Sequence, residues 1–319
     1  MADPAQAARS MWTLFEPIHA VTYFAPEART AFGQEGLRGF WRGYFAGRAA
    51  PLGPAGAAVV TASFYNFAPA MVARAIPGVW ELVSPAKALR ARWAGATAAL
   101  RRLLAGQEQA AAEAADQLIR VARGLDCAGR VLAAANTVLP APDHSLPEPD
   151  IALARLWQAA TTLREHRGDG HFAVMAAADI DGCEALVLRC ALDMRREDLQ
   201  PIRGWSDEEW DAARAQLTDR GLIGPDGGIT EAGRAAHAAV EEATDRAAAR
   251  PWARLGPEGT AALAGVLLPV ARACAREIPY PSPIGVPVPG SPVPASPGEA
   301  ESGRTSAVSA APTCPNGID

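Results

Sequence analysis

The stretch that decides the fold is residues 205–252, which read WSDEEWDAARAQLTDRGLIGPDGGITEAGRAAHAAVEEATDRAAARPW. Ser206 followed three residues later by Glu209 is a capping box, so a helix is predicted to begin at about residue 206. An apolar face at helical spacing continues it, formed by Trp210, Ala213 and Leu217. Gly221 follows where a helix commonly ends on a left-handed residue, so the helix is predicted over about 206–220.

Two very short strands and a second helix are predicted after this point. Leu222-Ile223 and Ile229-Thr230 flank the turn Asp226-Gly227-Gly228, and the next helix runs from Thr230 to about Arg250. Helix, small hairpin and helix together outline a winged helix over residues 206–250. The outline resembles the module of MarR-type regulators, in which the first of these helices would be the recognition helix.

The charge of this module argues against contact with DNA. Residues 206–252 hold ten carboxylates against five arginines, and the first helix opens with Asp207, Glu208, Glu209 and Asp211. A helix that meets phosphates usually carries Lys or Arg instead. We therefore expect the module to be a scaffold, or to act on something other than DNA.

The 319 residues are predicted to form a mainly α protein with two domains and a tail. The proline-rich run PAPDHSLPEP at 140–149 separates a helical N-terminal domain, 1–139, from a helical domain, 150–278, that contains the winged helix. Residues 279–319 are rich in Pro, Ser and Gly, and we expect them to be disordered.

Other features of the sequence point to the cytoplasm. The five cysteines are scattered without a Cys-x-x-Cys pair, which is typical of reduced thiols, and the N-terminus lacks a signal pattern. Charges, Gly or Pro interrupt every long apolar run, so no membrane span is predicted. No phosphate-binding loop, dinucleotide fingerprint or nucleophile elbow occurs, so no cofactor can be named.

Candidate ligand-binding residues begin in EPIHAVTYF, residues 16–24. Glu16 and His19 share a helical face, but bundles that hold metal with Glu-x-x-His use the motif twice, so we predict no metal. A polar lining for a ligand pocket, with Tyr23 adding a hydroxyl, is favoured. The alternative is a buried carboxylate–imidazole pair.

Two further runs carry aromatic and polar residues. In FWRGYFAGRAAP, residues 40–51, Trp41, Tyr44 and Arg48 suit a planar or anionic ligand, although the same pattern fits core aromatics with surface arginines. In SFYNFAP, residues 63–69, Tyr65 and Asn66 would either orient a ligand or bond across the core.

The run HRGDGH, residues 166–171, is the most site-like cluster of the second half. Its glycines predict a turn, on which His166 and His171 flank Asp169. Asp169 would orient either imidazole for acid–base chemistry. The alternative is that Asp169 caps the next helix.

Several of these motifs together resemble a known family. EPIHAVTYFAPEA, GLRGFWRGYFAGRAAPLG, HRGDGH and ARAQLTDRGLI are similar to those of an actinobacterial family filed as helix-turn-helix, MarR-like or SalK-like. The resemblance covers about residues 10–275. It implies a winged-helix fold and a role in transcriptional regulation.

Two functions follow as hypotheses. The favoured one is a small-molecule protein, a tailoring enzyme or accessory protein of a specialised-metabolite pathway, acting on an aromatic or anionic metabolite. His19, or His166 with Asp169, would be its acid–base group and Arg48 its anion clamp, with HRGDGH closing the site. The alternative is a ligand-responsive MarR-like regulator that binds DNA as a dimer.

Overall fold

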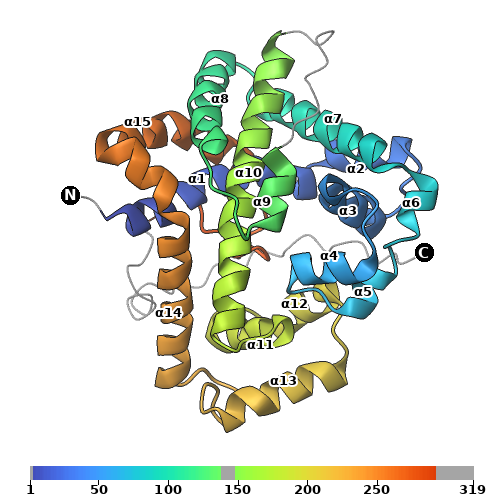
Figure 1. The fold of residues 1–319 in the computed structure, drawn as a ribbon, viewed down its shortest axis with the longest axis vertical. Coiled ribbons are helices and arrows are strands. Elements are labelled where there is room, and N and C mark those ends of the chain that lie inside the picture. Colours follow the sequence, from blue (N-terminus) through green and yellow to red (C-terminus); the bar gives the residue numbers. More distant parts are fainter. Residues whose placement is uncertain (1–2, 138–147, 292–319) are drawn as a thin grey trace.

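The computed structural model describes residues 3–137 and 148–291, and these residues are almost entirely helical (Figure 1). Helix accounts for 74% of the described residues, which confirms the mainly α prediction. The helices are α1 (Pro4–Phe24), α2 (Pro26–Gln34), α3 (Phe40–Ala49), η1 (Ala50–Leu52), α4 (Ala57–Phe64), α5 (Pro69–Ala73), α6 (Val79–Leu82), α7 (Pro85–Leu103), α8 (Glu108–Arg123), α9 (Val131–Thr137), α10 (Glu148–Ala177), α11 (Gly182–Leu192), α12 (Arg196–Arg203), α13 (Asp207–Asp219), α14 (Glu231–Ala248) and α15 (Arg250–Ala275).

Helices α1 and α10 form the centre of the molecule. In Figure 1, α10 runs through the middle of the fold with α8, α9 and α14 beside it, and α1 packs against α10, α14 and α15. The largest hydrophobic cluster combines buried side chains of α1, α7, α8, α10 and α15, among them Ile18, Leu100, Leu118, Trp157 and Leu267. The core therefore joins both sides of the predicted boundary. Most of that boundary, 138–147, lies outside the described residues.

A second hydrophobic cluster lies under α3 to α7 and positions the aromatic residues of the first third. It buries Phe45, Phe64 and Ile76. Helix α3 approaches α2 closely because it has a glycine at the contact: a Cβ on Gly47 would lie 2.3 Å from the Phe32 ring. Substitution of that glycine would push apart the two helices that carry the walls of the cavity described below.

Helix α10 continues through HRGDGH, so the turn predicted at 166–171 is wrong. Gly170 allows another chain segment to approach, since a Cβ there would lie 2.6 Å from Nη1 of Arg130. Arg130 uses this space to donate hydrogen bonds to the carbonyls of His166 and Ala247. Packing on α8, α9 and α14 outweighs the low helix propensity of the two glycines.

The two helices predicted within residues 205–252 are present. Ser206 and Glu209 form the capping box of α13, Gly221 is left-handed with φ of 69°, and the Thr230 hydroxyl caps α14 by accepting from Gly233 N. Instead of two strands, the described residues show a single antiparallel bridge between Ile223 and Ile229. A wing usually requires strands, so the winged helix remains a prediction.

The expectation of a disordered segment from residue 279 onwards is wrong for its first part. Val286 and Ser282 are buried, and Val286 and Ile284 belong to a small cluster with Ala20 and Tyr23 of α1. Arg203 Nη2 also donates to the carbonyl of Pro283 over 3.1 Å. Apolar residues between the prolines are enough to hold this segment against the body. Residues 292–319 lie outside the described residues.

Helix α15 is the one described helix whose length and composition would let it cross a membrane. Leu263, Leu267 and Val270 on one of its faces are buried in the largest cluster, against α1 and α8. A core helix passes the same test of length and composition. The burial of this face shows that α15 serves here as a core helix.

Candidate functional site

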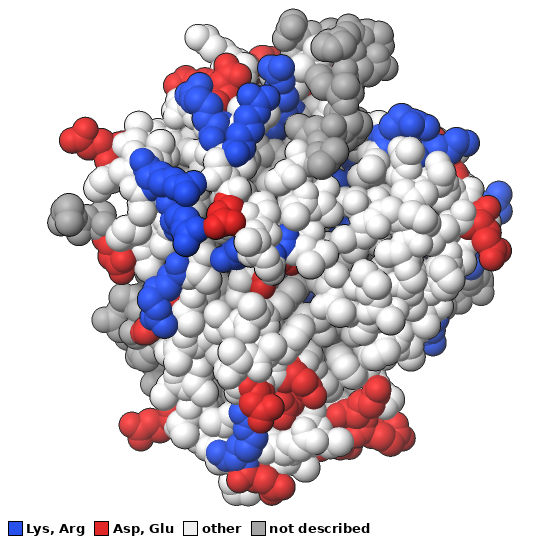
Figure 2. Space-filling view, viewed as in Figure 1, with Lys and Arg blue, Asp and Glu red and all other residues white. Residues whose placement is uncertain are grey.

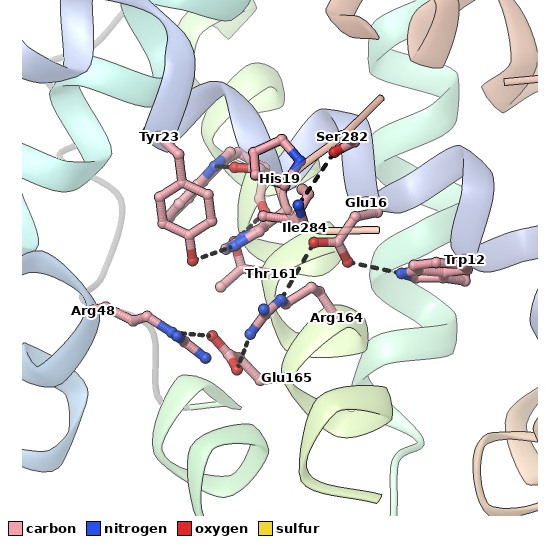
Figure 3. Close-up of polar contacts among 12 residues, drawn as sticks. Trp12, Glu16, His19, Tyr23, Arg48, Thr161, Arg164, Glu165, Ser282 and Ile284 are labelled. Atoms are coloured by element: carbon pink, nitrogen blue, oxygen red, sulfur yellow. Dashed lines mark hydrogen bonds and ion pairs between the residues drawn. The ribbon is translucent and has the colours of Figure 1, made fainter. Parts of the chain in front are cut away.

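A group of charged side chains is buried where α1, α3, α7 and α10 meet (Figure 3). It consists of Glu16 from α1, Arg48 from α3, Arg92 from α7, and Arg164 and Glu165 from α10. Arg48 is 5% exposed, Arg92 6% and Glu165 1%. Charges so far from water are costly unless they are paired, so their partners decide what the group can do.

The two carboxylates are shared among the arginines. Glu165 accepts a hydrogen bond of 2.7 Å from Arg164 Nη1, and its other oxygen lies 3.6 Å from Arg48 Nε. Glu16 lies 3.4 Å from Arg164 Nε and accepts from the Trp12 indole over 3.0 Å. Three guanidinium groups therefore face two carboxylates. Burial also raises the pKa of Glu16, so the negative charge of this carboxyl group is less favoured.

Some N–H groups of these arginines have no partner among the described residues. Arg48 Nη1 donates to the Tyr44 hydroxyl over 3.0 Å, and Arg92 Nη2 donates to Asn136 Oδ1 over 3.0 Å. Nε and Nη2 of Arg48 and Nε of Arg92 are buried without any hydrogen bond. Each unmade bond of a buried donor costs about 1–3 kcal/mol, and more for a charged group.

Both arginines nevertheless keep their charge. Burial lowers the pKa of Arg92 to about 10, which leaves the guanidinium protonated at neutral pH. Burial also opposes the charge of Arg48, but Tyr44 and Glu165 outweigh it and the pKa of Arg48 is raised. Each guanidinium lies over an aromatic ring, with Arg48 4.2 Å from the centroid of Phe64 and Arg92 5.0 Å from that of Trp157.

These arginines line a cavity of about 240 Å³, a volume that includes space open to solvent. His19, Tyr23, Phe32 and Tyr44 form other parts of its wall. A second cavity of about 310 Å³ shares Tyr23, Phe32 and Tyr44 with the first and is also lined by Phe40, which is 36% exposed. The two cavities share part of their walls and therefore adjoin.

His19 is held firmly at the inner cavity. Its Nδ1 lies 2.9 Å from the Thr161 hydroxyl, and its Nε2 lies 2.8 Å from the Tyr23 hydroxyl (Figure 3). The ring stacks on Trp157 at a centroid distance of 6.0 Å. Burial lowers the pKa of His19 well below its ordinary value, so the imidazole is neutral at pH 7.

The structure brings together five of the predicted residues: Glu16, His19, Tyr23, Tyr44 and Arg48 form or adjoin the cavity. The other three predicted for ligand contact lie elsewhere. Trp41 packs against Phe45 and Phe67 in the second cluster and is not part of either cavity wall.

Tyr65 bonds across the core, which was the alternative to ligand contact, whereas Asn66 does so only through its backbone, and its side-chain oxygen has no hydrogen-bond partner among the described residues. The Tyr65 hydroxyl donates to the carbonyl of Ile180 over 2.6 Å, and its ring stacks on Phe172. The carbonyl of Asn66 accepts from the Trp205 indole over 3.0 Å. Both residues therefore attach the end of α4 to the segments around α10, α11 and α12.

His166, Asp169 and His171 do not form a common cluster, and none lines either cavity. Asp169 accepts from Ala133 N over 2.9 Å, in the first turn of α9, so it caps a helix other than the one predicted. His171 Nδ1 lies 2.9 Å from the Thr244 hydroxyl of α14. Burial lowers the pKa of His166 and of His171 to about 4. HRGDGH does not close the site.

Sequence reasoning missed Arg92, Thr161, Arg164 and Glu165. Arg92 carried a usable signal, because it lies four residues from Ala88 and four from Ala96, both on the buried stripe of α7. The other three belong to the run TTLRE, which lies inside a helix. A charge placed on a buried face is informative because it needs a partner.

Comparison with known proteins assigns the chain to a family. The model of a helix-turn-helix family matches residues 8–281, which include every helix of the cavity together with α13 and α14. No curated protein and no solved structure matches the chain. The match spans most of the 319 residues, and the chain belongs to this helix-turn-helix family.

Proposed function

We propose that the protein binds a small, planar, anionic metabolite in the cavity between α1, α3 and α7. The unpartnered N–H groups of Arg48 and Arg92 carry the proposal. A carboxylate placed between them would accept the hydrogen bonds that no described protein group accepts. Arginine is the residue best suited to this, since its fork of donors matches a carboxylate.

The charge balance around the cavity supports the same ligand. Glu165 already contacts both Arg48 and Arg164, so Arg92 has no carboxylate of its own. A buried cation without a counter-charge destabilises the empty protein. A ligand anion would remove that penalty on binding, and its affinity would come largely from this difference.

The aromatic side chains support a flat ligand. Phe32, Tyr44 and Tyr23 line both cavities, and Tyr23 and Tyr44 lie 5.1 Å apart between ring centroids. Apolar walls with few polar groups are typical of small-molecule sites. With the side chains as they lie, the inner cavity has room for about one water molecule, so entry of an aromatic ring requires its wall to open.

In the form of an enzyme, the protein would be a cytoplasmic tailoring or accessory protein of a specialised-metabolite pathway. His19 is the only predicted histidine that lines the cavity, so we propose it as the acid–base group. Burial lowers the pKa of His19 and keeps its imidazole neutral, which is the form that could accept a proton from a reacting group.

Membership in a helix-turn-helix family favours a second candidate, a ligand-responsive winged-helix regulator that binds DNA through α13. The surface opposes it. Asp207, Glu208 and Asp211 are exposed on α13, and acidic side chains gather at the lower end of the molecule, where α13 lies (Figure 2). The nearby Arg196 is already paired with Asp207 and Asp211, at 2.6 and 3.1 Å.

A gel shift separates the two candidates. The surface charge of α13 predicts that promoter DNA binds only weakly and that exchange of Asp207 and Asp211 for Asn strengthens binding through lost repulsion. Specific binding by the wild-type protein that falls steeply with salt would favour the regulator instead.

Calorimetric titration with benzoate and with its neutral analogue benzamide tests the anion site. We expect benzoate to bind more tightly than benzamide, and Arg92→Met to weaken benzoate by about 10- to 100-fold, the worth of a hydrogen bond to a charged group. Arg90→Met is the matched control, because Arg90 is exposed on the same helix. Equal affinities for the acid and the amide, or an unaffected Arg92→Met, would refute the proposal.

A further inference from the structure

The hydrogen bonds around His19 fix which of its nitrogens carries the proton. The Thr161 hydroxyl has one proton and donates it to the carbonyl of Trp157 over 2.8 Å. Toward His19 it therefore acts as acceptor, so the 2.9 Å contact requires a proton on Nδ1. The neutral ring carries only one such proton, which leaves Nε2 as a bare acceptor.

The direction of the next bond follows from this. Nε2 lies 2.8 Å from the Tyr23 hydroxyl, and because Nε2 has no proton, Tyr23 must donate. The only proton of that hydroxyl is thereby directed away from the ligand. Tyr23 lines both cavities, so its oxygen offers lone pairs alone to whatever enters.

Tyr44 has the opposite role. Its oxygen accepts from Arg48 Nη1 over 3.0 Å, and its own proton has no acceptor among the described residues. Around the inner cavity lie hydrogen-bond donors of Arg48, Arg92 and Tyr44, and one acceptor, the oxygen of Tyr23. A simple aromatic carboxylate would satisfy the donors and leave the acceptor without a partner.

We propose that the ligand is an aromatic carboxylic acid whose ring also carries a hydroxyl or amino group. This inference rests on the proposed function. The carboxylate would meet Arg48 and Arg92, and the ring substituent would donate to the oxygen of Tyr23. Figure 3 shows the Tyr23 hydroxyl turned toward His19, with Arg48 beyond it, so both ends of such a ligand would be recognised from one cavity.

A binding series with benzoate, its three monohydroxy isomers and the three matching methoxybenzoates tests this inference. The methoxy group fills similar space but has no proton to donate. For at least one position on the ring we expect the hydroxy acid to bind about three- to tenfold more tightly than its methoxy counterpart, the worth of one neutral hydrogen bond. In Tyr23→Phe that ratio should fall to about one.

A second variant tests the direction of the bonds rather than the presence of Tyr23. Thr161→Val keeps the shape of the side chain but removes the acceptor that holds the proton on Nδ1. His19 is then free to carry its proton on Nε2 and donate to Tyr23, whose own proton turns to the cavity. We expect the preference to shift toward the methoxy acid, whereas Thr161→Ser, which keeps the hydroxyl, retains the preference of the wild type.

The outcomes separate this inference from the function on which it rests. Benzoate binding with no preference for any hydroxy isomer would overturn the role of Tyr23 and leave the anion site intact. A preference that survives Tyr23→Phe would also overturn it. Failure of every acid in the series to bind would refute the anion site itself, and the inference with it.

Discussion

At the scale of single residues, the arginines of the cavity are buried with part of their hydrogen-bonding capacity unused. Arg92 is buried, stacks on Trp157, makes one hydrogen bond to Asn136 and leaves Nε without a partner. Removing a poorly satisfied buried charge is often neutral or stabilising, because the desolvation penalty disappears with it. On the proposed function, the role of Arg92 would be to bind the ligand anion and not to stabilise the fold.

The first prediction follows for the ligand-free protein. Arg92→Met should change the free energy of unfolding by no more than about 1 kcal/mol, or should raise it, because an apolar side chain of similar length takes the place of an unpaired charge. Urea denaturation of the ligand-free protein measures this. A loss of about 3 kcal/mol or more would show that protein contacts alone hold the arginine.

The second prediction concerns pH and His171. Its folded-state pKa of about 4 is below the ordinary value of 6.5, so the unfolded chain binds more protons and stability falls as pH drops from about 6.5 to 4. His166 acts in the same direction, while Asp169, whose pKa burial raises to about 6, partly offsets both. His171→Asn keeps a donor for Thr244 without titrating.

Melting temperatures at pH 7 and pH 5 test this reasoning. The wild-type protein should lose stability between the two, and His171→Asn should lose less. An equal loss in both proteins would mean that His171 is not the neutral, buried group that its bond to Thr244 indicates.

The sequence predicted which candidate residues lie together where helical spacing joins them. Glu16, His19 and Tyr23 share one helix, so their common face was readable from the spacing alone. Arg48 and Tyr44 are four residues apart on α3 in the same way. Arg164 and Glu165 were not identified, because their role depends on α10 crossing α1, a contact that no local pattern encodes.

At the scale of helices and turns, caps were easier to predict than glycines. The capping box at Ser206 and the hydroxyl cap at Thr230 are local bonds, and both are present. Gly168 and Gly170 suggested a turn, yet they lie within α10, where Gly170 gives space to Arg130. A sequence shows that a glycine is present but not which neighbour needs the space.

The third prediction concerns Gly233, a glycine that allows a neighbouring segment to approach closely. In Gly233→Ala the new Cβ would lie 2.1 Å from the carbonyl oxygen of Leu222, so the start of α14 must move away from the turn that follows α13. We expect a loss of about 2 kcal/mol or more, at the larger end of single substitutions. Chemical denaturation measures it.

Gly265→Ala provides the comparison. Gly265 lies on the exposed side of α15 with no atom within 4 Å of a Cβ, so alanine there should stabilise by about 0.5–1 kcal/mol through helix propensity. If both variants lose equal stability, the close contact between Leu222 and α14 does not explain the loss in Gly233→Ala.

At the scale of the whole molecule, the C-terminal segment belongs to the fold. Composition predicted disorder from residue 279, because prolines dominate and aromatics are absent after Tyr280. Ile284 and Val286 nevertheless pack beside Tyr23, a wall residue of both cavities. Average composition cannot show that two apolar side chains pack against α1.

The fourth prediction compares two shortened chains. A chain that ends at Ile278 should be less stable than one that ends at Ser291 by about 2 kcal/mol or more, since burying a side chain such as Val286 contributes about 1.5–3 kcal/mol. Thermal unfolding of both measures the difference. Equal stabilities would show that the segment adds nothing to the core around α1.

The domain plan shows the same limit of sequence reasoning. A proline-rich run suggested two separate halves, whereas Phe15 and Trp157 share one hydrophobic cluster with Leu267. Composition marks where a chain is exposed but not which helices return to pack together. The mainly α class was predictable because long amphipathic segments encode it locally.

The most direct test of the central claim is a crystal structure of the protein grown with benzoate. We predict that the carboxylate lies within hydrogen-bonding distance of Nε or Nη2 of Arg48 and of Nε of Arg92, with the ring between Phe32 and Tyr44. A structure in which these nitrogens bond to protein groups, and benzoate is absent from the cavity or bound elsewhere, would contradict it.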